Sequence, residues 1–174
     1  AYSDSNNACV SPNTAKYVLT WIVPQSHSNK YSAPVGTNIM SKSSMAIGYS
    51  HQAIMQNRAL NMVSALGYKA VSNSCGGNNV ACGILAGNGE HGRFDYLVDP
   101  KFGGLVRLSD FILTDLPLTP TPPMDAGIWN FCQTCKKCAE VCPAAAISEE
   151  NEPTWEIENP GSNGIGLNSY HVDY

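Results

Sequence analysis

The chain has 174 residues, of which 43% are hydrophobic and 14% charged, with ten lysines and arginines against fourteen acidic residues. This composition is too apolar for a disordered tail, and a net charge of −4 without a basic run argues against nucleic acid or an anionic membrane as the main partner. No apolar run reaches about 18 residues and no basic segment precedes one, so we expect no transmembrane helix or signal peptide. The missing initiator methionine indicates a processed or excised chain.

The first 44 residues predict a single strand between polar segments. Residues 1–16 form a polar lead-in, and 17–23 form an apolar run that ends before Pro24, as is typical of a buried strand. The stretch 25–44 is rich in serine, asparagine, proline and glycine and therefore predicts a loop.

The clearest predicted helix extends from Ser50 to Leu66. Its apolar residues recur at spacings of three and four, Ser50 is a suitable N-cap, and Gly67 supplies the left-handed residue that ends many helices. Because one face of this helix is apolar, we expect it to pack on a sheet.

The segment after the helix predicts further strands and then a stiff connector. Strands are expected at 69–71, 80–86 and 105–116, with a glycine- and asparagine-rich turn between the first two. The proline-rich residues 117–123 predict an extended connector of the polyproline type. We take it as the boundary between a first domain at 1–118 and a second at 119–174.

Gly87, Gly89 and Gly92 follow the second of these strands with the letters of a dinucleotide-binding fingerprint. That fingerprint should open a helix, whereas Asp99-Pro100 and Gly103-Gly104 interrupt any helix here. Two interpretations stay open: the backbone passes close to a large ligand, or the segment is a plain glycine-rich turn.

Four of the seven cysteines lie within eleven residues, at Cys132, Cys135, Cys138 and Cys142. Gaps of two and three residues direct the sulfurs to one point, which suits a cluster of iron and sulfide held by thiolates. Zinc knuckles would need two widely separated CxxC pairs or histidines, and disulfide frameworks spread their cysteines, so both are less favoured. The apolar residues 128–131 are expected to shield the cluster. The remaining cysteines are favoured as small buried hydrophobes over ligands: Cys9, Cys75 and Cys82.

The stoichiometry of this motif leaves two possibilities. In two-cluster ferredoxins the fourth cysteine of such a run binds the other cluster, so the first three would need a thiolate from elsewhere. Residues 143–174 contain no cysteine. Either Cys142 completes a single cluster, or the chain stops before a second motif.

Together, four segments resemble the reductive dehalogenases, the corrinoid and iron–sulfur enzymes of organohalide respiration: LGYKA at 66–70, GEHGR at 89–93, LVRLSDFILTDLPL at 105–118 and FCQTCKKCAEVCPAAAI at 131–147. The resemblance implies an α/β (α+β) fold. A nitroreductase-like core would enclose a cobamide, a vitamin B12-type corrinoid, in its base-off form. A ferredoxin-like segment with two 4Fe-4S clusters in the full-length protein would supply electrons.

The C-terminal residues match the family's lead-in to a second cysteine motif, at Trp155, Asn159-Pro160-Gly161 and 170–173, and the chain then ends. We therefore expect an internal fragment, cut before that motif and inactive in isolation. The resemblance also implies location on the outer face of the cytoplasmic membrane, through a twin-arginine signal absent here. The implied partners are a small organohalide, a membrane-anchor protein and an electron donor.

The resemblance assigns roles to several residues. Tyr49, ahead of the predicted helix, matches the family's proton donor, with Arg107 as the candidate cation beside it and Arg93 as second choice. A half-buried hydroxyl at a helix entrance and a surface strand residue are the simpler interpretations of Tyr49 and Arg107. Contact with the corrinoid is expected at Gly87, Gly89, His91 and Gly92, with His91 acting through its backbone and not as a cobalt ligand.

Two other functions stay open. An epoxyqueuosine reductase-like enzyme shares the cobalamin and cluster design but handles tRNA, which predicts a basic surface that the charge balance does not supply. A ferredoxin-type electron carrier would not require the 118 residues ahead of the cluster segment. Which organohalide is used stays open among chloroethenes, chlorinated aromatics and brominated compounds.

Overall fold

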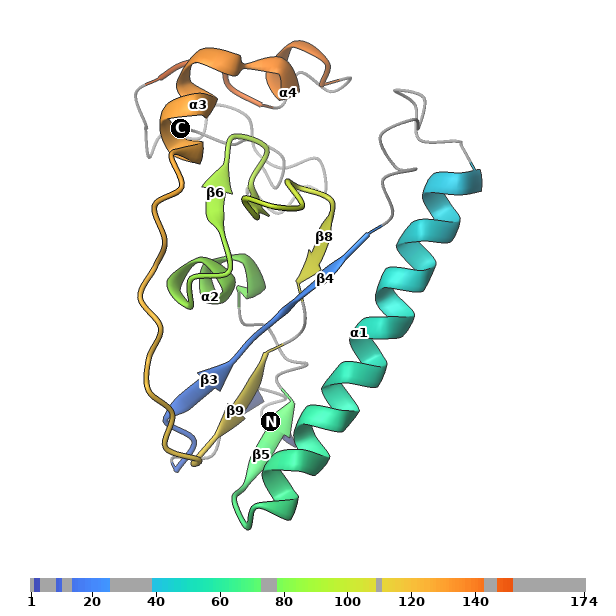
Figure 1. Cartoon of the computed structure of the whole chain (residues 1–174), viewed down its shortest axis with the longest axis vertical. Helices are drawn as coiled ribbons and strands as arrows, with labels where there is room; N and C mark the ends of the chain where they lie inside the picture. Colours follow the sequence, from blue (N-terminus) through green and yellow to red (C-terminus); the bar gives the residue numbers. More distant parts are fainter. Residues whose placement is uncertain are drawn as a thin grey trace.

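The computed structural model describes residues 2–3, 9–10, 14–25, 39–72, 78–108, 111–142 and 147–151 (Figure 1). The helices are α1 (Ile39–Ala65), α2 (Asn79–Leu85), α3 (Ile128–Cys135) and α4 (Lys137–Glu140). The strands are β1 (Tyr2–Ser3), β2 (Cys9–Val10), β3 (Tyr17–Leu19), β4 (Ile22–Pro24), β5 (Ala70–Ser72), β6 (Glu90–Gly92), β7 (Tyr96–Val98), β8 (Val106–Leu108) and β9 (Ile112–Thr114). The mixed α and β composition confirms the coarse fold class expected from the sequence.

Helix α1 is 27 residues long and begins well before the predicted start. The prediction that 25–44 is a loop and that Ser50 is the N-cap is wrong from residue 39 onward, because the serine-rich segment there continues the helix. Inside the helix, the Ser50 hydroxyl donates to the Ala46 carbonyl at 3.0 Å instead of capping. The predicted terminator is confirmed: Gly67 has a φ of +86°. Backbone hydrogen bonds from Gly67 to Ser64 and from Tyr68 to Val63 complete a Schellman motif.

Only part of the apolar face of α1 is buried in the described structure. Val63 is fully buried, whereas Met55, Met62 and Leu66 are exposed. The helix packs against β4, β5, β8 and β9, as Figure 1 shows. The expectation that this helix lies on a sheet is confirmed, but the sheet covers a narrower stripe than the sequence spacing suggests.

The strands next to α1 form two antiparallel sheets, and the chain runs from one to the other between β3 and β4 and again between β8 and β9. One has the order β3-β9-β5, with Leu113 opposite both Val18 and Val71, and the other pairs β4 with β8. The single strands predicted at 17–23 and 105–116 are therefore each divided in two. Tyr17 lies opposite Thr114 and Ile22 opposite Leu108, so a separation of five positions on one side faces a separation of six on the other. An unequal count of this kind breaks a ladder as a β-bulge does.

The strand predicted at 80–86 is wrong, because this segment forms α2. Asn78 caps the helix with its side chain, which accepts a hydrogen bond from the Ala81 amide at 3.0 Å. Gly83 brings the helix close to the core: a Cβ there would lie 2.8 Å from the Leu108 side chain and 2.9 Å from that of Leu97. A short apolar run fits a buried strand or a buried helix equally well, so spacing could not decide between them.

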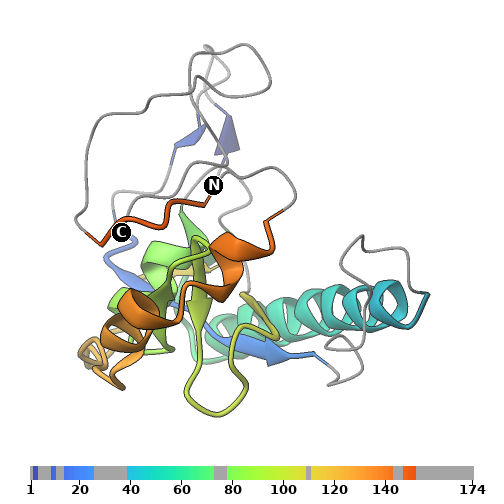
Figure 2. The same ribbon diagram turned by 90° about the horizontal axis from the view of Figure 1, so that it is seen from above.

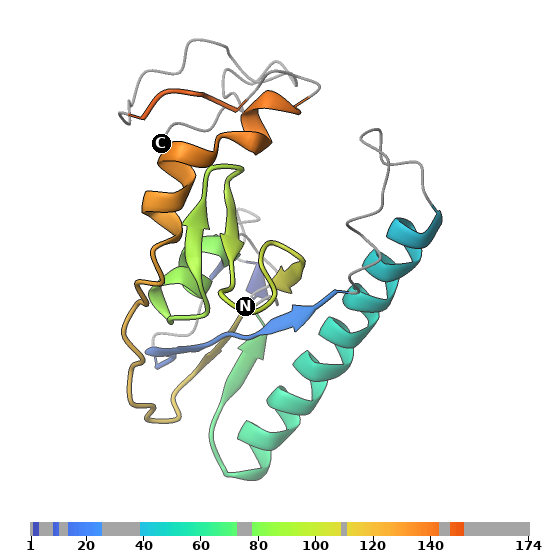
Figure 3. The same ribbon diagram turned by 45° about the horizontal axis from the view of Figure 1, so that its top comes forward.

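The connector lies against the core. Beyond β9 the chain is extended and runs beside α2 to reach α3 and α4, which sit at one end of the molecule next to β6 (Figures 1 and 3). The Thr121 hydroxyl donates to the Ala86 carbonyl at 2.7 Å. Figure 2 shows α1 extending to the opposite side from α3. No helix among the described residues is both long and apolar enough to cross a bilayer.

Candidate functional site

The structure brings together two of the residues singled out in the sequence, Tyr49 and Arg107. Arg107 lies on β8 opposite Val23, and its guanidinium carbon is 4.7 Å from the centre of the Tyr49 ring on α1. This geometry is a cation–π contact. Gly48 permits the close approach of helix and strand, since a Cβ there would lie 3.3 Å from the Arg107 side chain.

The environment of this pair differs from the sequence expectation in one respect. Tyr49 stands inside α1 and not at its entrance, because the helix begins at Ile39. Its side chain is 55% exposed, so one side of the ring is open while Arg107 contacts it.

The Nε of Arg107 is a hydrogen-bond donor whose surroundings distinguish it from that of a surface arginine. This nitrogen is buried and has no hydrogen-bond partner among the described residues. A buried N–H left unpaired costs about 1–3 kcal/mol, so it favours the approach of an anion or another acceptor. This observation favours a functional role over that of an ordinary surface strand residue.

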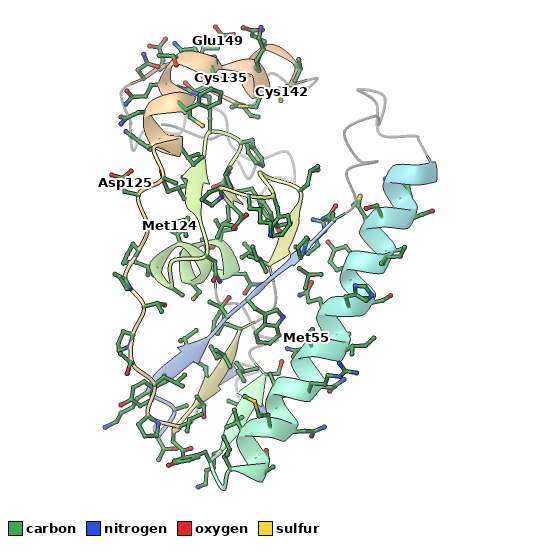
Figure 4. All side chains as sticks on the ribbon, in the orientation of Figure 1. Met55, Met124, Asp125, Cys135, Cys142 and Glu149 are labelled. Carbon is green, nitrogen blue, oxygen red and sulfur yellow. The ribbon has the colours of Figure 1, made fainter. Side chains whose placement is uncertain are left out.

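A hollow of about 520 Å³ lies between β4 and α1. It is lined by Trp21, Pro24, Ile54, Met55 and other residues of these two elements, and Figure 4 labels Met55 on the helix.

The three glycines at 87–92 are explained by contacts within the protein. A Cβ at Gly87 would lie 2.5 Å from the Pro122 carbonyl oxygen, and one at Gly89 would lie 2.5 Å from that of Val98. A Cβ at Gly92 would meet the Val98 side chain at 2.6 Å. The chain packs against itself here, and contact of these glycines with a corrinoid stays a prediction.

His91 belongs to the hairpin formed by β6 and β7. Its Nε2 lies 3.0 Å from the Asp95 carboxylate, four residues further on, at the surface. The following turn, where the sequence predicted a helix break, is closed by Asp99, whose side chain accepts from the amides of Lys101 and Phe102.

The cysteine motif lies on α3, on α4 and just beyond the end of α4. Cys132 and Cys135 are on α3, Cys138 is on α4, and Cys142 comes after it, each of them half-buried. A left-handed residue, Lys136 with a φ of +51°, separates the two helices. Figure 4 shows Cys135 and Cys142 at this end of the molecule.

The thiols are gathered but do not converge. Among the described residues, no three histidine, cysteine, aspartate or glutamate side chains are placed to hold a metal ion. Burial raises the pKa of the Cys138 thiol, while hydrogen bonds from backbone amides and the nearby charge of Arg93 act in the opposite direction. In type and spacing, four thiols within eleven residues are the donor set that iron–sulfur clusters use. The apolar shield expected at 128–131 is not formed, because Trp129 and Phe131 are both exposed.

Sequence reasoning missed Glu90. This carboxylate is 8% exposed and lies at the N-terminus of α3, where it accepts hydrogen bonds from the backbone amides of Ala126 and Trp129. The N-cap residue Gly127 has no side chain to serve those amides, so Glu90 satisfies them across the fold. No sequence signal marks Glu90, because the surrounding residues 87–93 are glycine-rich and polar and do not indicate that this carboxylate is buried.

Of the two arginines considered as the cation beside Tyr49, Arg107 contacts the tyrosine ring. Arg93 lies instead at the cysteine motif. The Arg93 side chain is fully buried, and its Nε donates to the Cys132 carbonyl at 3.1 Å. Its Nη1 donates to the carbonyls of Ser148 and Glu150, both at 2.7 Å. This places the second-choice cation beside the candidate cluster ligands.

The sequence matches no protein-family model. It is 37% identical over 126 residues to the trichloroethene reductive dehalogenase of Dehalococcoides mccartyi, covering 69% of this chain and 22% of that protein. A tetrachloroethene reductive dehalogenase of Sulfurospirillum multivorans is 33% identical over 147 residues, which are 84% of this chain and 28% of that protein. The chain belongs to the reductive dehalogenase family.

Solved structures agree with this assignment. One reductive dehalogenase, whose structure suggests a mechanism for B12-dependent dehalogenation, superposes with a TM-score of 0.69 at 28% identity. The superposed region is 79% of this chain and 20% of that dehalogenase chain. This chain thus spans between a fifth and about a quarter of the length of the reductive dehalogenases that it matches.

The epoxyqueuosine reductase alternative has weaker support. Such an enzyme from Cyclobacterium marinum is 34% identical over 68 residues, or 39% of this chain, against 84% for the relative from Sulfurospirillum multivorans. The reductive dehalogenase match therefore accounts for more than twice as much of the sequence.

Proposed function

We propose that the protein to which this chain belongs is a reductive dehalogenase that replaces a carbon–halogen bond by carbon–hydrogen. The reaction consumes two electrons and one proton and releases a halide ion. The observation that carries the proposal is the Tyr49–Arg107 pair, in which a guanidinium with a buried, unpaired donor lies over the ring of a tyrosine. A proton donor and a stabiliser of negative charge are the two groups that this reaction asks of a protein.

A bound cobamide would supply the reducing chemistry at the carbon–halogen bond. Tyr49 would then give its hydroxyl proton to the carbon that loses the halide. The cation of Arg107 would stabilise the phenolate left on Tyr49, and its buried Nε would donate to an anionic acceptor in the site. Corrinoid contact is proposed for the backbone of Gly87, Gly89, His91 and Gly92.

Cys132, Cys135 and Cys138 are proposed to bind a 4Fe-4S cluster. The support is the donor set itself, since three thiols follow one another at the spacing that such clusters use. Cys142 would either complete this cluster or bind a second one. When bound, the cluster would carry electrons toward the cobamide.

Substitution of Tyr49 by Phe in the full-length, corrinoid-loaded protein tests the catalytic role. We expect turnover to fall at least about a hundredfold, as removal of a general acid does, while the visible spectrum of the bound corrinoid is unchanged. Tyr68→Phe is the matched control, because Tyr68 lies beyond the C-terminal end of the same helix. Unchanged turnover in Tyr49→Phe would refute the assignment.

The substrate is proposed to be a small organohalide, and a halide-release assay against chloroethenes, chlorinated aromatics and brominated compounds would identify its class. Action at the outer face of the cytoplasmic membrane, with a membrane-anchor protein and an electron donor, is proposed from the family resemblance. Cell fractionation tests the location. Corrinoid binding by the full-length protein separates the enzyme from a ferredoxin-type carrier, which would bind none.

A further inference from the structure

One buried side chain, Arg93, is hydrogen-bonded to the start of the cysteine-bearing segment 132–142 and to residues just beyond it. Arg93 stands in the turn after β6 and donates through Nε to the carbonyl of Cys132, where the motif begins. Through Nη1 it donates to the carbonyls of Ser148 and Glu150, which lie just beyond the motif, and through Nη2 to the Asn151 side chain at 3.2 Å. The other three motif cysteines lie between these two anchor points.

Glu90 holds the start of α3, the helix that carries the first two motif cysteines. It lies three residues before Arg93 and accepts from the amides of Ala126 and Trp129, at the first turn of α3. Helix α3 packs against β6, so one short strand and its turn hold both the start of the helix and the residue Cys132 within it. Three of the oxygens that accept these hydrogen bonds from Arg93 are backbone carbonyls, and another is the Asn151 amide oxygen.

We propose that Arg93 is a positioning residue for the cluster ligands, which ties Cys132 to Ser148 and Glu150 and sets a positive charge beside the site. This inference rests on the proposed cluster at the cysteine motif. Five guanidinium donors in a rigid fork can bind oxygens from several segments at once, which lysine cannot do.

The charge of Arg93 has a second effect that a purely structural residue would not have. Reduction adds an electron to the cluster, and a nearby positive charge stabilises the reduced form. Loss of that charge therefore shifts the midpoint potential of the cluster to a more negative value. Substitution by lysine keeps the charge and removes the fork, so the two effects can be separated.

The test compares Arg93→Met and Arg93→Lys with wild type in the full-length protein, and Lys101→Met serves as an exposed charge-removal control. Hydrogen exchange of the amides at 128–142 reports on how firmly the cysteine-bearing segment is held. We expect it to accelerate about tenfold or more in Arg93→Met, since several charged hydrogen bonds are lost, and less in Arg93→Lys. Potentiometric titration followed by electron paramagnetic resonance should give a more negative midpoint in Arg93→Met and a value near wild type in Arg93→Lys.

Two results would overturn the inference. One is exchange and midpoint potential in Arg93→Met equal to those of wild type and Lys101→Met. The other is faster hydrogen exchange in Arg93→Lys that extends equally to α1, which would mean general destabilisation. If Arg93→Met does not fold, the exchange pattern of Arg93→Lys alone decides between local positioning and general destabilisation. Iron absent from the wild-type protein would instead refute the proposed cluster, while exchange at 128–142 would still report whether Arg93 holds the cysteine-bearing segment in place.

Discussion

The guanidinium of Arg107 lies 4.7 Å from the centre of the Tyr49 ring, although 58 residues separate the two in sequence. The pairing of β8 with β4 and the packing of α1 against both strands produce this contact. The helix supplies the hydroxyl and the sheet supplies the cation.

Substitution of Arg107 by Met tests the cation. We expect a large loss of turnover, on the order of a hundredfold, because one preorganised charge at a reacting group contributes roughly 3 kcal/mol. Arg107→Lys should retain part of the activity, since it keeps the charge without the buried Nε. Halide release measured on corrinoid-loaded protein checks this, and full activity in Arg107→Met would exclude an electrostatic role.

Substitution of Glu90 by Gln should lower the free energy of unfolding by about 1–3 kcal/mol, because a buried carboxylate that accepts two amide hydrogen bonds loses its charge. Asp125→Asn is the matched control. Asp125 is exposed and accepts only locally, from the Gly127 amide at 3.1 Å, so its effect should be within about 0.5 kcal/mol. Urea unfolding measures both, and equal effects would contradict the bridging role of Glu90.

Substitution of Gly83 by Ala should destabilise the protein by about 1–3 kcal/mol through overpacking against Leu97 and Leu108. Gly67→Ala offers a comparison, since its Cβ would meet nothing within 4 Å and only its φ of +86° is unfavourable. That change should cost about 1 kcal/mol. A smaller cost at Gly83 than at Gly67 would show that α2 can move away from the core.

Substitution of Cys135 by Ser should lower the iron and sulfide content of the anaerobically reconstituted, full-length protein by one cluster. Cys82→Ser should leave both contents unchanged, because Cys82 lies on α2 and is expected to serve as a small apolar residue. Equal iron content in wild type and Cys135→Ser would remove this cysteine from the ligand set.

Local signals predicted some elements correctly. Residue type and spacing predicted the end of α1 at Gly67, the short strand β5 and the mixed α and β content of the chain. Segment 80–86 could not be predicted in the same way, because the contacts of Gly83 with Leu97 and Leu108 are tertiary. The start of α1 was hidden by a serine-rich composition that also suits a loop.

The candidate site shows the same division. Residue type and family resemblance selected Tyr49, Arg107 and the cysteines. The roles of Glu90 and Arg93 could not be derived from spacing, since their partners lie 36 to 58 residues away. Tertiary proximity alone reveals that the hairpin of β6 and β7 belongs to the cysteine segment.

The separation between Arg93 and its partners also has a consequence for folding. During synthesis Arg93 emerges 39 residues before Cys132 and 58 residues before Asn151. Until those residues arrive, its guanidinium has to stay hydrated, although the hairpin turn that carries it is closed locally by the bond from the Asp95 amide to the Gly92 carbonyl. Formation of the hydrogen bonds of Arg93 is therefore a long-range step in folding that follows assembly of the nearby strands. The cysteine-bearing segment is ordered only after this step.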